Sequence, residues 1–526
     1  MTPDIPDAAT LPPDFNAVTH FIDRHLAQGR GNRVAVVDRS GDTTYGALAE
    51  RVNRAANLFR GLGLPPHSRV ALALLDSVEF PTAFWGALRA GVVPVCLNTR
   101  LTTDHYRHIL ADCRARALVV EASLLPPFTG LLDPLPDLER VLVVGDATPD
   151  TSDWAARLAE ASPQAETHAT HRDDIAFWLY SSGSTGTPKG VLHRHASLYW
   201  ISELYGQGVL GLTAEDRLFS AAKLFFAYGM GNSMTFPFGV GATAILHDGH
   251  PTPEKVLTLL ERHQPTLFCG VPTLCSALLG HRERAARPGS LALRLSLTAG
   301  EPLPPEVGRR WEARFGTPLI DGVGSTEMLH IFLSNRPDDN AYGTSGRAVP
   351  GYRLRLVDAE GQEVPAGEIG ELLVQGPSRA ECYANQPAKS RATFVDGWTH
   401  TGDSYYRDSD GRYRYCGRMD DMFKSGGIWV SPIEVEAALL EHAAVREAAV
   451  VPRADNAGNL KPLAVVVLRE AEANTALKSE LLAFVRQRLE SWKAPRWIEI
   501  VDALPRTASG KIQRFKLREI DRGAGT

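Results

Sequence analysis

The chain contains one stretch that decides its fold, Tyr180-Ser181-Ser182-Gly183-Ser184-Thr185-Gly186-Thr187-Pro188-Lys189-Gly190. Four small hydroxyl residues stand within the six positions 181–186, and a proline and a single lysine follow them. Glycines let backbone N–H groups turn toward one anion, hydroxyls add hydrogen-bond donors, and the lysine supplies a point charge. The stretch differs from the G-x-x-x-x-G-K-[ST] loop, because Thr187 and Pro188 follow Gly186. An apolar strand at 175–180 leads into it, which favours a polyphosphate-binding loop over a flexible Ser/Gly linker.

Helix and strand patterns alternate on both sides of this loop. Before it, the pattern predicts helices at 45–58 and 80–89 and strands at 34–38, 69–75, 92–96, 118–121 and 141–144. After it, the pattern predicts helices at 196–204 and 254–263 and strands at 218–222, 242–246, 266–271 and 295–299. This alternation is typical of βαβ units and predicts parallel sheets.

The pattern changes toward the C-terminus. Residues 352–357 and 370–374 alternate with a period of two around a turn, which predicts an antiparallel β section. Beyond 417–421, helical and strand patterns fill about a hundred residues, enough for a small α+β domain. We therefore predict a multidomain α/β and α+β fold. Its N-terminal domain, 1–419, holds stacked βαβ sheets and a β subdomain, and a small mobile C-terminal domain spans 420–526.

The composition is that of a globular chain. Of its 526 residues, 44% are apolar and 22% are charged, and the length alone predicts two or more domains. The formal charge of −5 argues against nucleic acid as the main partner. The six cysteines form no C-x-x-C pair, so we expect buried thiols in a reduced, cytoplasmic setting. No apolar run approaches the ~20 residues of a membrane helix, so no membrane partner is expected. A homodimer stays open.

A second motif, Asp321-Gly322-Val323-Gly324-Ser325-Thr326-Glu327, follows a predicted strand at 318–320. Its two glycines permit close backbone approach to a flat ligand. Asp321 can accept a hydrogen bond from an exocyclic amine, and Glu327 can hold Mg²⁺ directly or through water. Alone the motif also fits an ordinary strand and turn with a surface carboxylate. Beside the phosphate loop it indicates a nucleotide site.

The phosphate loop resembles that of the adenylate-forming enzymes, which include acyl-CoA synthetases, adenylation domains of peptide synthetases and firefly-type luciferases. The resemblance covers nearly the whole chain, with five motifs in the family's order. It implies that 321–327 holds adenine, the α-phosphate and the metal. The family usually has tyrosine where this chain has Val323. Adenine would then be held by apolar contact and by the neighbouring stretch Ala299-Gly300-Glu301-Pro302.

Two further motifs resemble the family's ribose and hinge segments. A carboxylate can bind both hydroxyls of a ribose, and an arginine can fix the ring or a phosphate from the other side. The resemblance gives these roles to Asp403, in Thr401-Gly402-Asp403, and to Arg418. It also places a hinge at Asp420 and a contact with the pantetheine arm of CoA at Ser425-Gly426-Gly427. Without the resemblance, this glycine-punctuated strip also fits a solvated linker.

The motif Pro505-Arg506-Thr507-Ala508-Ser509-Gly510-Lys511 lies near the C-terminus. In the family, its lysine bridges the acyl carboxylate and the α-phosphate, where a cation stabilises the charge of the transition state. Loss of such a contact typically costs about 3–4 kcal/mol. The matching lysine is reversibly acetylated in several relatives, so the resemblance implies a lysine acetyltransferase and a deacetylase as partners acting on Lys511.

Two segments, 223–231 and 328–332, are predicted to line the acid site with aromatic rings and small residues. The strings K-L-F-F-A-Y-G and G-S-T-E-M-L-H-I-F-L-S-N resemble benzoate–CoA ligases in particular. In those enzymes the ring is surrounded by the residues that match Ala227, Tyr228, Gly324, His330 and Ile331. His330 would cap the far end of the slot. The alternative for the phenylalanines in these segments is that they belong to the core.

The resemblance therefore implies an ATP-dependent aromatic acid–CoA ligase, with benzoate as the acid, that forms benzoyl-AMP and pyrophosphate and then benzoyl-CoA and AMP. Catalytic roles fall to Lys189, Glu327 and Lys511, and Mg²⁺ contacts fall to Glu327 and Thr185. The ATP contacts implied are Ser181, Ser182, Gly183, Ser184, Thr185, Gly186, Thr187, Lys189, Ala299, Gly300, Glu301, Asp321, Gly322, Val323, Gly324, Thr326, Asp403, Arg418 and Lys424.

Four alternatives stay open on the sequence: a hydroxy-, amino- or fluorobenzoate or a heteroaromatic acid as the acid, a carrier protein in place of CoA, a non-catalytic nucleotide sensor, and luciferase-type oxidation. No carrier domain follows Thr526, which favours free CoA.

Overall fold

The computed structural model describes residues 11–131, 135–146, 151–182, 187–281, 290–425, 428–455, 458–469, 474–506 and 512–518. By its internal contacts the chain divides into two compact units. Unit 1 comprises Met1–Leu354 and Val374–Thr399, and unit 2 comprises Arg355–Leu373 and His400–Thr526. The hinge at Asp420 stays a prediction. None of the helices in the described ranges has the length and apolar character that a membrane span requires.

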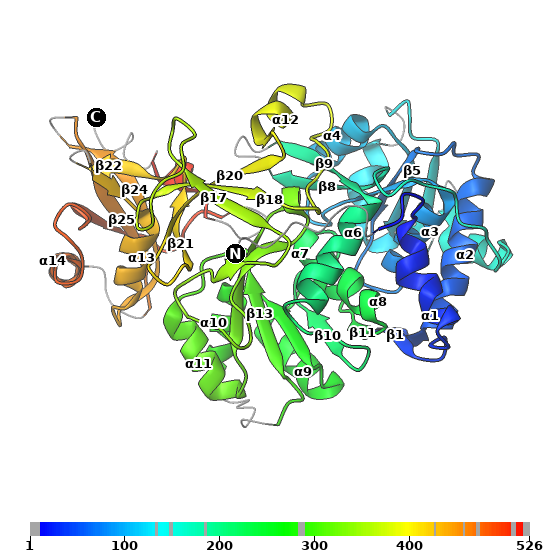
Figure 1. Cartoon of the computed structure of the whole chain (residues 1–526), viewed down its shortest axis with the longest axis horizontal. Helices are drawn as coiled ribbons and strands as arrows, with labels where there is room; N and C mark the ends of the chain where they lie inside the picture. The colour runs from blue at the N-terminus through cyan, green and yellow to red at the C-terminus, as the bar shows by residue number, and fades with distance from the viewer. Residues whose placement is uncertain are drawn as a thin grey trace. The chain divides into compact units, whose positions relative to one another are not determined.

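Unit 1 contains two large, mainly parallel sheets (Figure 1). The seven-stranded sheet has the order β7 (Ser152–Asp153), β6 (Arg140–Val144), β5 (Ala115–Glu121), β3 (Arg69–Ala73), β4 (Val93–Cys96), β8 (Ile175–Ser182) and β9 (Pro188–Arg194). The nine-stranded sheet has the order β16 (Arg347–Ala348), β15 (Ile331–Ser334), β14 (Leu319–Gly324), β13 (Leu295–Ala299), β12 (Leu267–Gly270), β10 (Arg217–Ser220), β11 (Thr243–Ile245), β1 (Val34–Asp38) and β2 (Gly41–Thr44). Antiparallel pairing is confined to β8–β9, β14–β15–β16 and β1–β2 among the described strands of these sheets, so the predicted βαβ organisation is confirmed.

Helices cover the faces of both sheets. The helices of unit 1 are α1 (Arg24–Ala27), α2 (Tyr45–Gly61), α3 (Glu79–Ala90), α4 (Thr103–Cys113), α5 (Trp154–Glu160), α6 (His195–Ile201), α7 (Ala227–Met230), α8 (Phe236–Val240), α9 (Pro253–His263), α10 (Pro272–Gly280), α11 (Pro305–Phe315) and α12 (Pro387–Thr393). Short 3₁₀ or π segments are η2 (Thr19–Asp23), η3 (Ala122–Leu124), η4 (Pro126–Leu131), η5 (Ser202–Gln207), η6 (Gly231–Thr235) and η7 (Thr326–Met328).

Local signals set the helix ends. The hydroxyl of Thr44 accepts a hydrogen bond from the Ala47 N–H at 3.2 Å and so caps α2. Thr252 caps α9 in the same way, and Pro253 follows at the first helical position, where its missing N–H costs nothing. Gly91 ends α3 in the left-handed region. These signals explain why the helical periodicity of the sequence locates these elements to within a few residues.

The period of two along β8 shows how the layers pack. Trp178 and Tyr180 pack with the cluster under α4 and η4, on one face of the seven-stranded sheet. Phe177 points the other way, and its ring lies 5.5 Å from that of Phe84 in α3. On the nine-stranded sheet, α9, α10 and α11 share a core with its strands in which Trp311 stacks on Phe268 at 5.7 Å (Figure 1). Alternate strand residues therefore bury both faces of each sheet.

A five-stranded sheet follows, with the order β17 (Arg353–Val357), β18 (Gly370–Gln375), β20 (Trp398–Arg407) and β19 (Phe394–Val395), and β21 (Tyr413–Arg418) pairs with β20. The described elements from residue 423 onward all belong to unit 2 and are β22 (Phe423–Ser425), β23 (Ile428–Val430), α13 (Pro432–Leu440), β24 (Val445–Ala454), β25 (Leu460–Leu468), α14 (Thr475–Arg486), β26 (Trp497–Ile500) and α15 (Arg514–Leu517). Val435, Leu439 and Val485 of its helices pack on Val466 and Ile498 of its strands, which confirms the predicted α+β character.

Candidate active site

The described ends of the phosphate stretch, 180–182 and 188–190, belong to two paired strands. Strands β8 and β9 pair antiparallel, with Ser181 opposite Lys189 and Ser182 opposite Pro188. The strand predicted at 175–180 therefore extends to Ser182, and the prediction of a loop is wrong for Ser181, Ser182 and 188–190, because the strand ladder continues to the Ser182–Pro188 pair. Proline is tolerated here since it is the first residue of β9. The predicted phosphate contacts Gly183, Ser184, Thr185 and Gly186 lie outside the described residues, and Thr187 directly precedes β9.

Lys189 forms an ion pair with Glu327, the carboxylate predicted to hold the metal. Its Nζ lies 2.7 Å from Glu327 Oε1, and the two side chains are 12% and 15% exposed. Burial raises the pKa of Glu327, but the charge of Lys189 and hydrogen bonds from Lys189 and Tyr383 outweigh burial, and the pKa lies below its ordinary value. Glu327 is therefore an ionised, half-buried carboxylate at neutral pH. The structure brings together two of the three predicted catalytic residues.

Tyr383, which was not predicted from the sequence, contacts both members of this pair. Its hydroxyl donates to Glu327 Oε1 and accepts from Lys189 Nζ, each at 2.7 Å. The residue lies just before α12, in a segment without a glycine-rich or charged motif. Its position depends on contacts with residues 194 and 56 positions away in the sequence.

The nucleotide motif lies on strand β14 and on the connection that follows. The sequence predicted that Asp321 follows the strand, but β14 runs through Gly324. In the parallel register Ala299 of β13 lies beside Gly322, so two segments predicted to hold adenine are neighbours. Only glycine fits at 324, since a Cβ there would stand 2.5 Å from the carbonyl oxygen of His330. Thr326 and Glu327 belong to η7, where the Ser325 hydroxyl accepts from the Met328 N–H at 3.2 Å.

Asp321 is a buried carboxyl group among the residues predicted to meet the nucleotide. Burial raises its pKa well above the ordinary value, although a backbone hydrogen bond from Gly322 lowers it. Among the described residues, none forms a hydrogen bond with Asp321 Oδ1. A buried polar atom of this kind usually has a partner, and an amine of a bound base would supply one. Val323, which stands in place of the family's tyrosine, lies opposite Leu333 of β15 and is half-buried.

Gly300 and Glu301, which follow β13, form a turn that is bound to the start of α10. Gly300 has φ +89°, a left-handed conformation that turns the chain sharply after Ala299. The Glu301 carboxylate accepts hydrogen bonds from the Thr273 hydroxyl at 2.6 Å and from the Thr273 N–H at 3.2 Å. Glu301 therefore ties this turn to the start of α10.

The residues predicted to surround the aryl ring come together from α7 and from the β14–β15 hairpin. Gly324 lies opposite Ile331 across the hairpin. His330 Nε2 lies 3.3 Å from the carbonyl oxygen of Tyr228, and the planes of the two rings are inclined by 29°, with centroids 5.6 Å apart. The Tyr228 hydroxyl donates to the carbonyls of β12 and β13, so the ring is fixed. Ala227, beside it at the start of α7, is half-buried.

His330 is neutral and enclosed. Burial lowers its pKa to about 3, and the hydrogen bond with the Tyr228 carbonyl compensates only in part. The ring of Phe236 meets it edge-on at 4.5 Å. A Cβ at Gly231 would stand 2.3 Å from the imidazole, so this glycine gives the ring its space. His330 therefore acts through its shape and its neutral nitrogens, not through charge.

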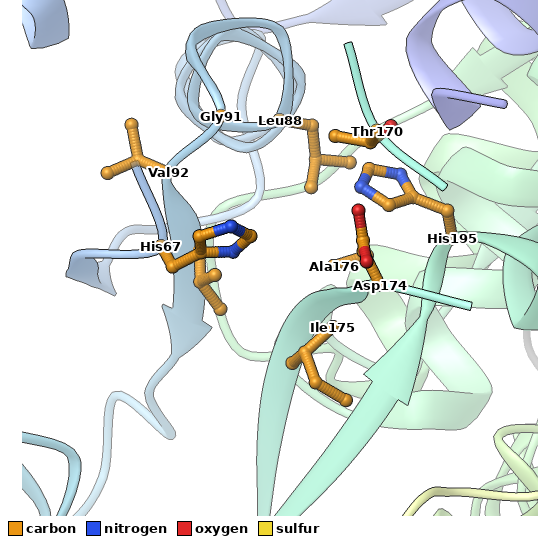
Figure 2. Close-up of a pocket in the computed structure, with 10 residues that line it drawn as sticks. His67, Leu88, Gly91, Val92, Thr170, Asp174, Ile175, Ala176 and His195 are labelled. Atoms are coloured by element: carbon orange, nitrogen blue, oxygen red, sulfur yellow. The ribbon is translucent and has the colours of Figure 1, made fainter. Parts of the chain in front are cut away.

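Two cavities lie elsewhere in unit 1. One of about 170 Å³ is lined in part by Lys223 and Phe225, at the start of the predicted aryl segment. There Asp76 accepts a hydrogen bond from the Leu224 N–H at 3.1 Å and pairs with Lys223 at 3.7 Å. The other, of about 10 Å³, is large enough for one water molecule and is flanked by His67 and His195 (Figure 2). None of the predicted site residues lines the second cavity.

The ribose candidates form a pair in unit 2. Asp403 of β20 lies opposite Arg418 of β21, and Arg418 Nη1 is 2.9 Å from Asp403 Oδ1. The same Nη1 donates to the Thr401 carbonyl at 2.8 Å. Burial lowers the pKa of Arg418, but the charge and hydrogen bond of Asp403 raise it above its ordinary value.

The hinge and CoA candidates are described only in part. The carbonyl of Asp420 accepts a hydrogen bond from Arg518 at 3.0 Å. Lys424 is exposed on β22, and the buried Ser425 beside it lies 3.4 Å from Lys461 Nζ. Gly426, Gly427 and Lys511 lie outside the described residues. Among the described residues, no cluster of three or more His, Cys, Asp or Glu is arranged to hold a metal ion.

All six cysteines are free thiols, and five of them are buried, as the sequence predicted. Burial raises the pKa of each buried thiol, so these thiols are poor nucleophiles at neutral pH.

Comparison with known proteins gives matches along nearly the whole chain. The family model described as "AMP-binding enzyme" matches residues 23–384, and the model described as "AMP-binding enzyme C-terminal domain" matches 434–511. The chain is 51% identical to a benzoate–CoA ligase of Thauera aromatica, over 98% of this chain and 97% of that protein. It is 49% identical to a 4-hydroxybenzoate–CoA/benzoate–CoA ligase of Rhodopseudomonas palustris, over 97% and 95% of the two chains.

Solved structures agree with these matches. An anthranilate CoA ligase in complex with anthranoyl-AMP superposes with a TM-score of 0.93 at 40% identity, over 98% of each chain. A benzoate CoA ligase from Burkholderia xenovorans LB400 superposes with a TM-score of 0.89 at 47% identity, over 96% of this chain and all of that one.

Proposed function

The chain belongs to the AMP-binding enzyme family, and from that premise we propose that it is an ATP-dependent aromatic acid–CoA ligase whose acid is benzoate. The reaction has two halves. A benzoate oxygen bonds to the α-phosphorus of ATP while the bond to pyrophosphate breaks, and this gives benzoyl-AMP. The sulfur of CoA then bonds to the acyl carbon while AMP leaves.

One observation carries this proposal: the β14–β15 hairpin supplies candidate residues to both substrates. Asp321 and Glu327, assigned to the nucleotide, lie on the same hairpin as Gly324, His330 and Ile331, assigned to the ring. An acid bound against His330 and a nucleotide bound against Glu327 would both contact this hairpin and would therefore lie close to each other. Such closeness is what the first half-reaction requires, because the carboxylate must approach the α-phosphorus in line with the leaving group.

In the first half-reaction, we assign to Lys189 the phosphates of ATP, where its ammonium offsets the charge of the leaving pyrophosphate. Glu327 is ionised and half-buried, which suits Mg²⁺, an ion that usually takes one or two carboxylates together with substrate phosphates. With Thr185 it would hold that ion, whose positive charge would offset that of the phosphates. Asp403 is assigned to the ribose hydroxyls and Arg418 to the ring or phosphate beside them.

The second half-reaction needs a different set of groups. We assign to Lys511 the carboxylate and the α-phosphate during adenylation. A lysine in that place would obstruct the thiol of CoA, so Lys511 must leave before the thiol reacts. A rotation at Asp420 would remove it and bring up Ser425, Gly426 and Gly427 for the pantetheine arm. An acetyl group on Lys511 would remove its charge and stop adenylation, so we also propose that acetyltransferases and deacetylases act there.

The acid site favours an uncharged ring. Tyr228, His330 and Ile331 offer aromatic and aliphatic surface, and His330 is neutral because burial lowers its pKa to about 3. No charge in this set would compensate a second carboxylate on the ring. Benzoate therefore fits better than a dicarboxylic acid, and small hydroxy-, amino- or fluoro-substituted benzoates are the acids to compare with it.

Measuring AMP release from ATP, CoA and a panel of aryl acids tests the proposal. We expect benzoate to have the highest kcat/KM of the panel, with no AMP formed in the absence of acid. Replacing CoA by a pantetheine-loaded carrier protein should abolish thioester formation. Turnover only with the carrier protein, or only with a non-aromatic acid, would contradict the proposal. We place the reaction in the cytoplasm, where ATP and CoA are available.

A further inference from the structure

Tyr383 connects the two charged side chains assigned to the nucleotide. Lys189 Nζ donates to Glu327 Oε1 and to the Tyr383 hydroxyl, and that hydroxyl donates to the same Oε1, each at 2.7 Å. The ammonium also lies 4.1 Å from the centroid of the Tyr383 ring. Tyr383 is 4% exposed, so the three polar groups form a closed triangle that is largely shielded from water.

The backbone around Tyr383 fixes where its hydroxyl lies. The segment that carries it pairs with β9, where the Leu192 N–H donates to the Cys382 carbonyl at 3.1 Å. On its other side, the Ala380 N–H donates to the Glu327 carbonyl at 2.7 Å. Tyr383 is thereby bound to the strand of Lys189 and to the segment of Glu327 at once. These contacts fix the backbone, and because the ring is 4% exposed and packs on Phe394 with centroids 5.3 Å apart, the hydroxyl has little room to follow a ligand.

Lys189 and Tyr383 differ in how they respond to a polyphosphate. An ammonium on a long, flexible side chain is drawn to phosphate oxygens, which compete with Glu327 for it. A neutral tyrosine hydroxyl on a fixed backbone lacks this charge and is attracted to phosphate oxygens much less strongly. When the ammonium turns to the nucleotide, the half-buried Glu327 loses its charged partner and keeps the tyrosine as a donor. A buried carboxylate that loses its donors is costly, so the remaining hydrogen bond matters more after ligand binding than before.

We propose that Tyr383 is a positioning residue that releases Lys189 to the phosphates of ATP and retains Glu327 in place to receive the nucleotide's metal. This inference rests on the proposed function, because it assumes that Mg·ATP is the ligand. It also predicts the direction in which the Tyr383 hydroxyl changes the affinity for ATP. A hydroxyl that only locks the free protein would oppose ATP binding, whereas a hydroxyl that supports Glu327 in the complex favours it.

The test uses the Tyr383→Phe variant of the full chain, which keeps the ring and removes only the hydroxyl. Calorimetry measures the binding of Mg·ATP and of benzoyl-sulfamoyl-adenosine, an uncleavable mimic of benzoyl-AMP without β- and γ-phosphates. We expect Mg·ATP to bind about tenfold more weakly, and the mimic to bind within twofold of wild type. Tyr45→Phe is the matched control, since its buried hydroxyl donates to Ala242 at 2.7 Å, and it should leave both ligands unchanged.

A double-mutant cycle then tests whether Tyr383 acts through Glu327. Once Glu327→Gln has removed the carboxylate, adding Tyr383→Phe should change Mg·ATP binding by less than twofold. Unchanged or tighter binding of Mg·ATP by the single Tyr383→Phe variant would overturn the inference, and so would equal weakening of both ligands or additive effects in the cycle. Wild-type protein that binds neither ligand would instead overturn the proposed function, and this inference with it.

Discussion

Replacement of His330 by alanine tests the shape of the acid site. The imidazole is 2% exposed and lies among the rings of Tyr228, Phe236 and Tyr205, with centroids 4.5 to 5.8 Å away. Because burial lowers its pKa to about 3, the ring is neutral throughout the working pH range and limits the substrate by its volume. Alanine at this position would leave a cavity against three aromatic side chains that the backbone holds apart.

The expected magnitude follows from this packing. Removing a large buried side chain typically costs about 2–5 kcal/mol of stability, depending on how far the site collapses. A methyl group that fills a pocket is worth about 1–3 kcal/mol, or 10- to 200-fold in kcat/KM. We therefore expect the kcat/KM of at least one of 2-, 3- and 4-methylbenzoate, relative to that of benzoate, to rise by 10-fold or more in His330→Ala.

The assay is AMP formation from ATP and CoA with one acid at a time, either benzoate or one of the methylbenzoates. His195→Ala is the control, because His195 is equally buried and neutral but borders the small cavity away from the predicted site (Figure 2). This control variant should have a lower melting temperature, but its kcat/KM for each methylbenzoate relative to benzoate should equal that of the wild type. A folded His330→Ala variant with wild-type ratios for all three methylbenzoates would refute the placement of His330 in the acid site.

Three further predictions concern the hinge, the terminal lysine and pH. Asp420→Pro should leave benzoyl-AMP formation within a few-fold of wild type and stop thioester formation, because proline fixes φ at the proposed pivot; equal loss of both halves contradicts the pivot. Lys511→Ala should slow benzoyl-AMP formation by about 10²–10³ and spare the reaction of supplied benzoyl-AMP with CoA; a loss of both, or of neither, counts against its role. Stability should fall as pH drops below about 6.5, because burial lowers the pKa of His193 and His195 to about 4 and an unfolded histidine takes up a proton there. Each histidine should lower the free energy of unfolding by roughly 1.4 kcal/mol as the pH falls from 7.5 to 5.5. A melting temperature that does not change over this range would contradict the assignment.

Alternating apolar patterns predicted most of unit 1 because its strands are buried on both faces and its helices carry clear end signals. The strands Val34–Asp38 and Leu295–Ala299 agree with the sequence pattern to the residue. Residues 188–190 were predicted as loop, since Pro188 and Gly190 are loop signals by themselves. Pairing of β9 with β8 overrides that local preference, and a local sequence pattern does not contain this pairing.

Some residues of the candidate site could be predicted from local motifs, and another could not. Charged and glycine-rich motifs identified Lys189 and Glu327, and the fold places their charges 2.7 Å apart. Tyr383 was missed because it lies 194 residues from Lys189, and its role depends on a backbone pairing with β9 that no local motif announces. A residue such as Tyr383, which has no local motif of its own and depends on neighbours distant in sequence, is found only when the fold is known.

The exchange of labelled pyrophosphate into ATP tests the central claim most directly, since it reports reversible formation of an acyl-adenylate without CoA. With Mg²⁺, ATP and benzoate, the protein should catalyse rapid exchange, and omission of benzoate or substitution of Lys189 by methionine should reduce it strongly. Exchange that never exceeds the acid-free background with benzoate or with any simple substituted benzoate would contradict the account.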